Sequence, residues 1–242
     1  MTSRIYAIIP ARSGSQGLAN KNIKLFNGKP LLAYSIQFAK HLNIDKIICS
    51  TDSENYADIA LSYGAEVPFL RSIEASSSTA MEQDILKNMY ENFKEFKIQQ
   101  PQIIVWLRPT FVFRQLEDVN YCIQLLLNNR SFTAARTICE TEGRLYKLEK
   151  QNLIPDFDDK GKSMIRRQDI GIKYKVFNAD VFRSSIHNIG NDYLGRNIAG
   201  VVTNKLCGLD IDDSFDFSLI ENILLHNKKL VNEQIDASYL DF

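Results

Sequence analysis

The chain alternates short apolar runs with segments whose apolar residues recur at helical spacing. The runs Ile5–Ile9, Lys46–Cys49 and Gln102–Leu107 have the length of strands and are apolar enough to be buried on both faces. Helical spacing marks the segments 31–39, 53–63, 79–93, 115–127 and 214–225. Strands that alternate with helices pair in parallel and are covered on both sides. The pattern therefore predicts a three-layer α/β fold with a mostly parallel sheet and helices on both faces.

Residues 141–175 interrupt this alternation. Arg144–Leu148 alternates polar and apolar residues like an exposed hairpin strand, and Pro155–Lys162 is a polar loop. Ser163–Tyr174 is basic and has little helical period. We predict that residues 1–242 form one domain, into which a β-rich arm at about 141–175 is inserted.

Local signals complete the expected order of elements. Strands at 176–182 and 199–203 return to the main sheet, and a short strand is expected at 66–70. Thr79 is the expected N-cap of the helix that follows it, because its hydroxyl can accept a hydrogen bond from the first helical N–H groups. Residues 228–242 are predicted to be a polar tail.

The first apolar run opens into a loop with two glycines and several cations. Gly14 and Gly17 can adopt backbone angles that other residues avoid, and successive N–H groups in such a turn form a concavity that binds anions. Arg12 and Lys21 add positive charge beside it. The loop lacks the first glycine of the dinucleotide fingerprint and the Gly-Lys-Ser/Thr of the P-loop. Because ligands of open α/β sheets bind at the carboxyl ends of strands, we predict a phosphate site here.

Four carboxylates crowd the junction before the last predicted helix. Asp210 and Asp212 lie two residues apart, so in a strand they would point to the same face. Such a pair can hold Mg²⁺ together with substrate phosphates. Asp213 and Asp216 are instead expected to cap the helix and to interact with its dipole.

Composition excludes several other classes of function. Lys and Arg number 29 against 29 Asp and Glu, so no long-range field favours nucleic acid or an anionic membrane. The cysteines and histidines do not have the spacing of a zinc site; they are Cys49, Cys122, Cys139, Cys207, His41, His187 and His226. No Ser/His/Asp arrangement is visible in the sequence either. No apolar run approaches the ~18 residues of a membrane span, and no signal peptide precedes the first strand. We expect a cytoplasmic protein without disulfides.

Five segments resemble, in the same order, motifs of the acylneuraminate cytidylyltransferases, also called CMP-sialic acid synthetases. They are Ile9–Gly17 with Lys21–Asn22, Ser50–Asp52, Leu70–Arg71 with Ser78–Ala80, Leu107–Thr110, and Leu209–Asp212. The resemblance implies a nucleotidyltransferase-type, Rossmann-like sheet. It implies transfer of CMP from CTP to the anomeric hydroxyl of a sialic-acid-type nine-carbon α-keto sugar acid, with release of pyrophosphate. It also implies Mg²⁺ or Mn²⁺ as cofactor, and a homodimer in which the arm crosses to the partner.

The resemblance, together with the chemistry of the loop, assigns roles to individual residues. The expected nucleotide site consists of Arg12, Ser13, Gly14, Ser15, Lys21, Asn22, Arg71 and Ser78. Arg12, Lys21 and Asp212 are the expected catalytic residues, since positioning and charge stabilisation dominate such transfers. The residues expected to face the sugar acid are Arg108, Arg167 and Lys175, and those expected to hold the metal ion are Asp210 and Asp212.

The chain departs from the family pattern at the expected sugar end. Arg108 stands where the family has glutamine, and Phe111–Phe113 replaces Ser-Pro-Leu. Serine replaces an aspartate within Ser76–Thr79, and Lys175–Asn178 replaces Arg-Pro-Asn-Gly. A guanidinium can pair bidentately with a carboxylate, which an amide cannot do as strongly. These changes leave open a legionaminic, pseudaminic or eight-carbon ulosonic acid as the substrate, and also a non-catalytic nucleotide-binding homologue.

Overall fold

The computed structural model describes residues 4–161, 164–184 and 192–242. A seven-stranded sheet runs in the order β11-β6-β10-β5-β1-β4, with β9 paired to β6. The strands are β1 (Ile5–Pro10), β4 (Lys46–Ser50), β5 (Ile103–Trp106), β6 (Ala134–Thr141), β9 (Lys173–Lys175), β10 (Asp180–Arg183) and β11 (Ile198–Val202). Within this sheet β10 and β9 run against the direction shared by the other strands. The predicted mostly parallel sheet is confirmed.

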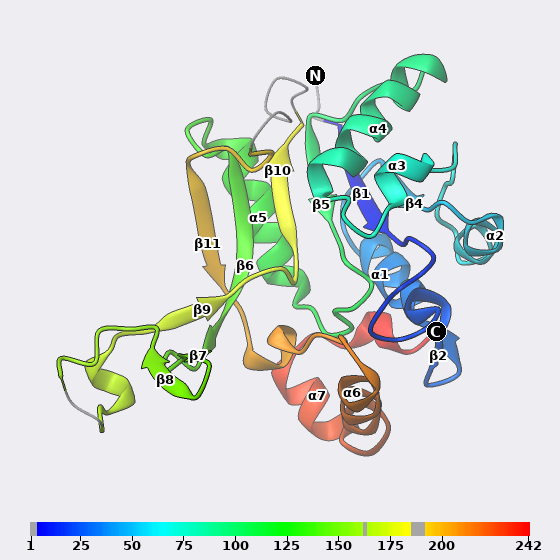
Figure 1. Cartoon of the computed structure of the whole chain (residues 1–242). Coiled ribbons are helices and arrows are strands. Elements are labelled where there is room, and N and C mark those ends of the chain that lie inside the picture. Colours follow the sequence, from blue (N-terminus) through cyan, green and yellow to red (C-terminus); the bar gives the residue numbers. More distant parts are fainter. Residues whose placement is uncertain (1–3, 162–163, 185–191) are drawn as a thin grey trace.

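Alternate residues of β1 face two separate cores. Ile5, Ala7 and Ile9 pack in one core with α1 (Leu31–Lys40) and α5 (Leu116–Asn128). Tyr6 and Ile8 pack in the other core, with α4 (Glu82–Glu95). Successive side chains of a strand point to opposite faces, so one apolar run serves both cores. Helices therefore cover both faces of the sheet, as predicted (Figure 1).

The remaining elements are further helices, single 3₁₀ turns and a small hairpin. The other helices are α2 (Glu54–Ser62), α3 (Ile73–Ser76), α6 (Ser214–His226) and α7 (Lys228–Gln234), with single 3₁₀ turns at Lys21–Ile23, Arg167–Asp169, Lys205–Gly208 and Ser238–Leu240. β2 (Leu25–Phe26) and β3 (Lys29–Pro30) form a small hairpin before α1. In the part of the chain that the structure describes, no helix is both long and apolar enough to cross a bilayer.

Two predictions between β4 and α4 are wrong. Residues 66–70 form no strand, and Glu66 makes only an isolated bridge with Ile48. Pro68 lies two residues further on and has no N–H to continue a ladder. The helix expected to begin at Thr79 begins after Met81, whose N–H donates to the carboxylate of Asp84 at 2.8 Å. The N-cap of α4 is therefore Met81, two residues later than the predicted Thr79.

The prediction of a polar tail at 228–242 is also wrong. This segment forms α7 and a final turn, and it buries Val231, Ile235, Tyr239 and Leu240. The Tyr239 ring packs edge-on against Phe38, with 4.9 Å between ring centroids. Apolar side chains spaced along a mostly polar segment are enough to hold it on the core.

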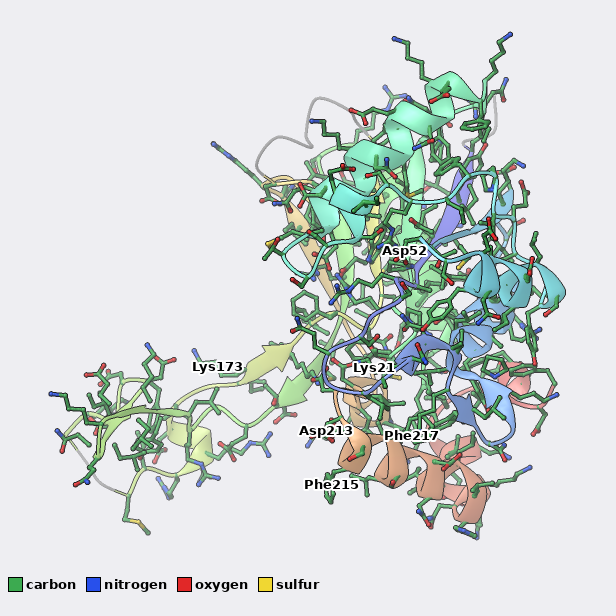
Figure 2. All side chains as sticks on the ribbon, turned by 45° about the vertical axis from the view of Figure 1, so that its right-hand side comes forward. Lys21, Asp52, Lys173, Asp213, Phe215 and Phe217 are labelled. Atoms are coloured by element: carbon green, nitrogen blue, oxygen red, sulfur yellow. The ribbon has the colours of Figure 1, made fainter. Side chains whose placement is uncertain are left out.

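Residues 141–175 leave the body of the protein, as the expected β-rich arm. Within the arm, β7 (Tyr146–Glu149) and β8 (Asn152–Pro155) pair as an antiparallel hairpin. Figures 1 and 2 show this arm extending to one side, beyond Lys173. Most of its large apolar side chains are exposed, such as Met164 at 92%, whereas Ile165 is buried. The use of the arm in dimerisation stays a prediction.

Candidate active site

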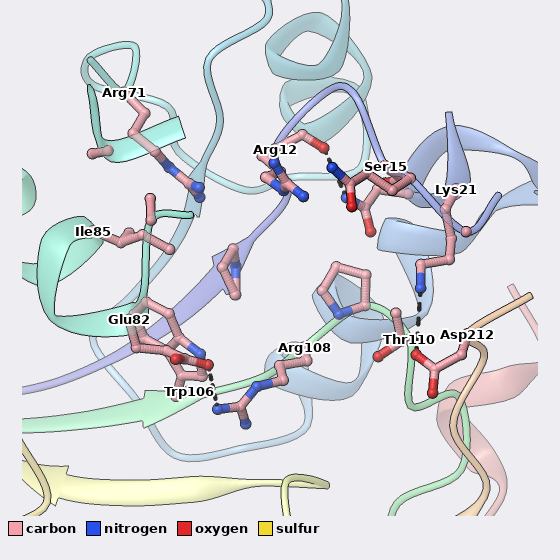
Figure 3. A pocket seen from close by; sticks show the side chains of 17 residues that line it. Arg12, Ser15, Lys21, Arg71, Glu82, Ile85, Trp106, Arg108, Thr110 and Asp212 are labelled. Carbon is pink, nitrogen blue, oxygen red and sulfur yellow. Dashed lines mark hydrogen bonds and ion pairs between the residues drawn. The ribbon is translucent and has the colours of Figure 1, made fainter. Parts of the chain in front are cut away.

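A cavity of about 520 Å³ opens at the carboxyl ends of β1 and β5 (Figure 3). Its walls come from the loop after β1, the region of α3 and α4, the loop after β5, and the segment before α6. The predicted site residues among its lining are Arg12, Ser15, Lys21, Asn22, Arg71, Arg108 and Asp212. The sheet topology thus brings together residues that are nearly 200 positions apart in the chain (from Arg12 to Asp212).

The loop after β1 is fixed from behind. Asp52 accepts two hydrogen bonds from Ser13, one from its N–H at 2.7 Å and one from its hydroxyl at 2.7 Å. Burial opposes the charge of Asp52, but these hydrogen bonds lower its pKa below the ordinary value. Gly14 has a φ of +69°, and a Cβ on Gly17 would lie 2.5 Å from the carbonyl oxygen of Asp212. Both glycines are therefore required by the path of the loop.

The backbone N–H groups of this loop are available to a ligand. The N–H of Ser13 donates to Asp52. The N–H groups of residues 14–17 donate no hydrogen bond to any part of the chain that the structure describes. A run of such amides that borders a cavity is an anion-binding arrangement. Residues 15–17 of this loop line the cavity, and their binding of phosphate stays a prediction.

Two cations beside the loop are held by backbone carbonyls. The guanidinium of Arg12 donates to the carbonyl of Ser77 at 3.2 Å. The ammonium of Lys21 donates to the carbonyl of Ile211 at 2.7 Å and lies 3.8 Å from the carboxylate of Asp212. Asn22, predicted to contact the nucleotide, donates its amide to the carbonyl of Arg12 at 3.0 Å and so shapes the loop.

Arg71 is buried against the end of β4. Its Nε donates to the hydroxyl of Ser50 at 3.1 Å, and a second donor meets the carbonyl of the same residue. Burial lowers the pKa of Arg71 to about 10, so the group remains a cation at neutral pH. On the opposite wall, the indole N–H of Trp106 is buried and has no partner among the described residues. It is a donor that a ligand could satisfy.

Arg108 is held by two carboxylates. Nη1 lies 2.8 Å from Asp180. Nη2 lies 2.8 Å from Glu82, a contact that Figure 3 shows. Burial alone would lower the pKa of Arg108, but these two carboxylates raise it above the ordinary value. Asp180 also binds Arg136, whose Nε lies 2.6 Å away.

The sequence analysis did not identify Glu82, Arg136 or Asp180. A signal existed for Asp180, because a carboxylate within the apolar run 176–182 must find a partner once it is buried. The position of Glu82 gave no such signal, since an acidic residue in the first turn of a helix is fully explained by the helix dipole.

Several predicted residues do not line this cavity. Ser13 and Gly14 belong to the loop after β1 but are not lining residues, and Ser78 is exposed between α3 and α4. Arg167 lies on the arm and pairs with Glu140. The ammonium of Lys175 lies 5.6 Å from the ring centroid of Phe111. The predicted contacts of these residues with a ligand stay predictions.

The acidic pair has a different geometry from the one predicted. Asp210 and Asp212 lie in a segment that forms no strand, between a 3₁₀ turn and α6. Asp210 is partly buried, which raises its pKa, and its Oδ1 has no partner among the described residues. The Asp212 side chain is 78% exposed and lines the cavity. The expected caps are confirmed, since Asp213 accepts from the N–H groups of residues 215 and 216.

These two carboxylates suit a hard divalent cation. The described residues contain no group of three or more His, Cys, Asp or Glu side chains that could hold a metal ion. Mg²⁺ commonly takes one or two carboxylates and completes its shell with phosphate oxygens and water. The unpartnered oxygen of Asp210 and the exposed carboxylate of Asp212 fit that mode of binding.

Comparisons with known proteins agree with this geometry. The family model described as "Cytidylyltransferase" matches residues 6–196. An N-acylneuraminate cytidylyltransferase of Escherichia coli is 30% identical over 236 residues, which cover 95% of this chain and 54% of that protein. A pseudaminic acid cytidylyltransferase of Campylobacter jejuni is 30% identical, and the match covers 88% of this chain and 94% of that protein. A CMP-N,N'-diacetyllegionaminic acid synthase of Legionella pneumophila is 38% identical over 127 residues, which cover 50% of this chain and 53% of that protein.

Solved structures show the same fold. A CMP:2-keto-3-deoxy-manno-octonic acid synthetase complexed with CTP superposes with a TM-score of 0.66 at 14% identity, covering 93% of this chain and 100% of that one. A 4-diphosphocytidyl-2C-methyl-D-erythritol synthase of Anaerococcus prevotii gives a TM-score of 0.61 at 15% identity, covering 92% and 98%. The chain spans about half the length of the Escherichia coli and Legionella relatives, and nearly all of the Campylobacter jejuni one. On the family match and the near-complete Campylobacter alignment together, this chain belongs to the cytidylyltransferase family of nucleotidyl-transferring enzymes.

Proposed function

We propose that this protein transfers the cytidylyl group of CTP to the anomeric hydroxyl of a ulosonic acid, with a sialic-acid-type nine-carbon α-keto sugar acid as the first candidate. One observation carries the proposal: residues 15–17, whose amides donate no hydrogen bond within the described residues, line one cavity together with four cations. The cations are Arg12, Lys21, Arg71 and Arg108, and the carboxylates that line the same cavity are Glu82 and Asp212. This arrangement favours a polyanion such as a nucleoside triphosphate.

The reaction requires positioning and charge stabilisation. The hydroxyl oxygen of the sugar forms a bond to the α-phosphorus, the bond from that phosphorus to the pyrophosphate oxygen breaks, and the hydroxyl proton is released. Arg12, Lys21 and the loop amides hold the triphosphate and stabilise the charge that develops on pyrophosphate. Arg71 and Asn22 bind the nucleoside part of CTP. Asp210 and Asp212 would hold Mg²⁺ or Mn²⁺, and the bound ion would neutralise phosphate charge.

The identity of the sugar is the open part of the proposal. Relatives are named for acylneuraminate, pseudaminic acid and diacetyllegionaminic acid, and Arg108 stands at the position where the family pattern has glutamine. The test is a panel of acidic keto sugars with CTP and Mg²⁺, read by release of pyrophosphate. We expect turnover with a nine-carbon acid. Binding of CTP without turnover on any sugar of the panel would favour a non-catalytic homologue instead.

The arm suits contact with a second copy of the chain. Leu148, Leu153 and Met164 expose 71%, 64% and 92% of their surface, which is unusual for residues of this type and typical of a surface that a partner covers. Arg167 lies on the same arm and would then approach the partner's cavity. Sedimentation is expected to show a dimer at micromolar concentration, and a monomer would contradict this part of the proposal.

We also propose a cytoplasmic location. The four cysteines are buried as free thiols, which suits a reducing compartment. Fractionation of cells that make the protein, with detection by antibody, would test it, and recovery outside the cytoplasm would overturn it.

A further inference from the structure

Arg108 is fixed by a set of contacts that differ in kind. Asp180, which has no exposed side-chain surface, accepts from Arg108 on one oxygen and from Arg136 on both. If this buried carboxylate moved away, both guanidinium groups that share it would be left without a counter-ion. Asp180 is therefore the permanent partner of Arg108.

Phe177 contacts the same arginine through its ring and through its backbone carbonyl. Its ring lies 4.8 Å from the guanidinium carbon of Arg108 and 5.0 Å from that of Arg136. Its carbonyl accepts from Nη1 of Arg108 at 3.1 Å. Phe177 has a φ of +88°, a conformation that is costly for a bulky residue and persists only where surrounding contacts enforce it. The backbone is thus strained at Phe177, the residue that contacts Arg108.

Glu82 is a partner of another kind. Nη2 of Arg108 donates a hydrogen bond to Oε1 of Glu82 at 2.8 Å. Within the described residues, the Glu82 side chain makes no other hydrogen bond or ion pair. Its side chain is 28% exposed and lines the cavity from the first turn of α4. A partly exposed carboxylate with one hydrogen bond, on the wall of a ligand cavity, has fewer contacts to give up than the fully buried Asp180.

We propose that Glu82 is an exchangeable counter-ion of Arg108, which the carboxylate of the acceptor sugar displaces when it binds. The inference rests on the proposed function. Replacement of one carboxylate by another keeps the charge around Arg108 unchanged. A neutral sugar cannot make this replacement, so Glu82 stays on Arg108 and occupies part of the cavity. Glu82 is then a specificity-determining residue: it weakens the binding of every acceptor and most strongly penalises those without a carboxylate.

The test is the effect of Glu82→Gln on the KM for the acid sugar. The amide removes the competing charge and keeps the size of the side chain, so we expect this KM to fall about tenfold, while kcat and the KM for CTP change less than twofold. Glu91→Gln is the matched control, because Glu91 is an exposed carboxylate further along α4. In an Arg108→Gln background, Glu82→Gln is expected to have no effect on the KM for the sugar.

Each other outcome has a distinct meaning. An increased KM in Glu82→Gln would show that Glu82 itself binds the sugar, and an unchanged KM would show that it does not compete; either result overturns the inference alone. An equal fall in both backgrounds would show general electrostatics and no exchange on Arg108, which also overturns it. Failure of the unaltered protein to use any acid sugar would overturn the proposed function together with this inference.

Discussion

The two ends of the cavity hold their cations in opposite ways. At the loop end, Arg12 and Lys21 are oriented mainly by backbone carbonyls, which carry no net charge. At the other end, Arg108 is oriented by Glu82 and Asp180, which cancel its charge. A cation held by uncharged carbonyls keeps a net positive charge that can attract a polyanion. A cation held by carboxylates has little net charge left, but it is fixed in an orientation that can select one ligand group. This difference supports our proposal that the triphosphate binds at the loop end and a single carboxylate at the Arg108 end.

The largest effect is expected at the Arg108 end. Asp180→Asn leaves Arg108 and Arg136 without their shared counter-ion, and removal of one member of a buried ion pair costs about 3–5 kcal/mol. Urea denaturation should show this loss in the free energy of unfolding. Asp58→Asn, at an exposed position on α2, is the control and is expected to change it by less than about 0.5 kcal/mol. Equal stability of the two variants would show that the network at Asp180 does not hold the fold.

The next effect is on catalysis and belongs to the loop end. Lys21→Ala removes a cation that is held mainly by a backbone carbonyl and that we propose to bind phosphate, so kcat/KM for CTP should fall about 10²–10³-fold, while the fold is retained. Lys40→Ala, at the exposed end of α1, is the matched control and should behave like the unaltered protein. If both lysine variants kept full activity, Lys21 would have no role in stabilising the phosphates.

A smaller effect is expected where the C-terminal segment supports Arg108. The Tyr239 hydroxyl accepts from the N–H of Arg114 at 2.6 Å, and the guanidinium of Arg114 donates to the carbonyl of Arg108. Tyr239→Phe leaves a buried N–H unpaired and should lower the free energy of unfolding by about 1–3 kcal/mol. The KM for the acid sugar should rise more than the KM for CTP. A larger rise for CTP would contradict the division of the cavity into two ends.

The smallest effect is a dependence of stability on pH at the loop end. The pKa of Asp52 is lowered in the folded state, so its contribution is present above the ordinary pKa of 3.8 and is lost as pH falls through the lowered value. The unaltered protein should therefore be more stable than Asp52→Asn at neutral pH, and the difference should shrink below about pH 4. Denaturation at a series of pH values measures it, and a difference that does not vary with pH would exclude the charge of Asp52 as its cause.

Local patterns were enough to predict most of the sheet and the position of the loop after β1. The apolar run of β1 and the glycines and cations after it are contiguous, so their relation is visible in the sequence. The Arg108 end depends on pairs between distant residues, such as Arg108 with Asp180, and no local pattern announces them. The start of α4 was misplaced because Asp84 caps it through a side chain, and the final segment because few apolar residues anchor it.

The most direct test of the central claim is a crystal structure of the protein with CTP and Mg²⁺. The account predicts the triphosphate against the amides of residues 14–17, within reach of Arg12 and Lys21, with the metal ion between the phosphates and Asp210 and Asp212. A triphosphate bound outside this cavity, with Asp212 facing only solvent, would contradict it.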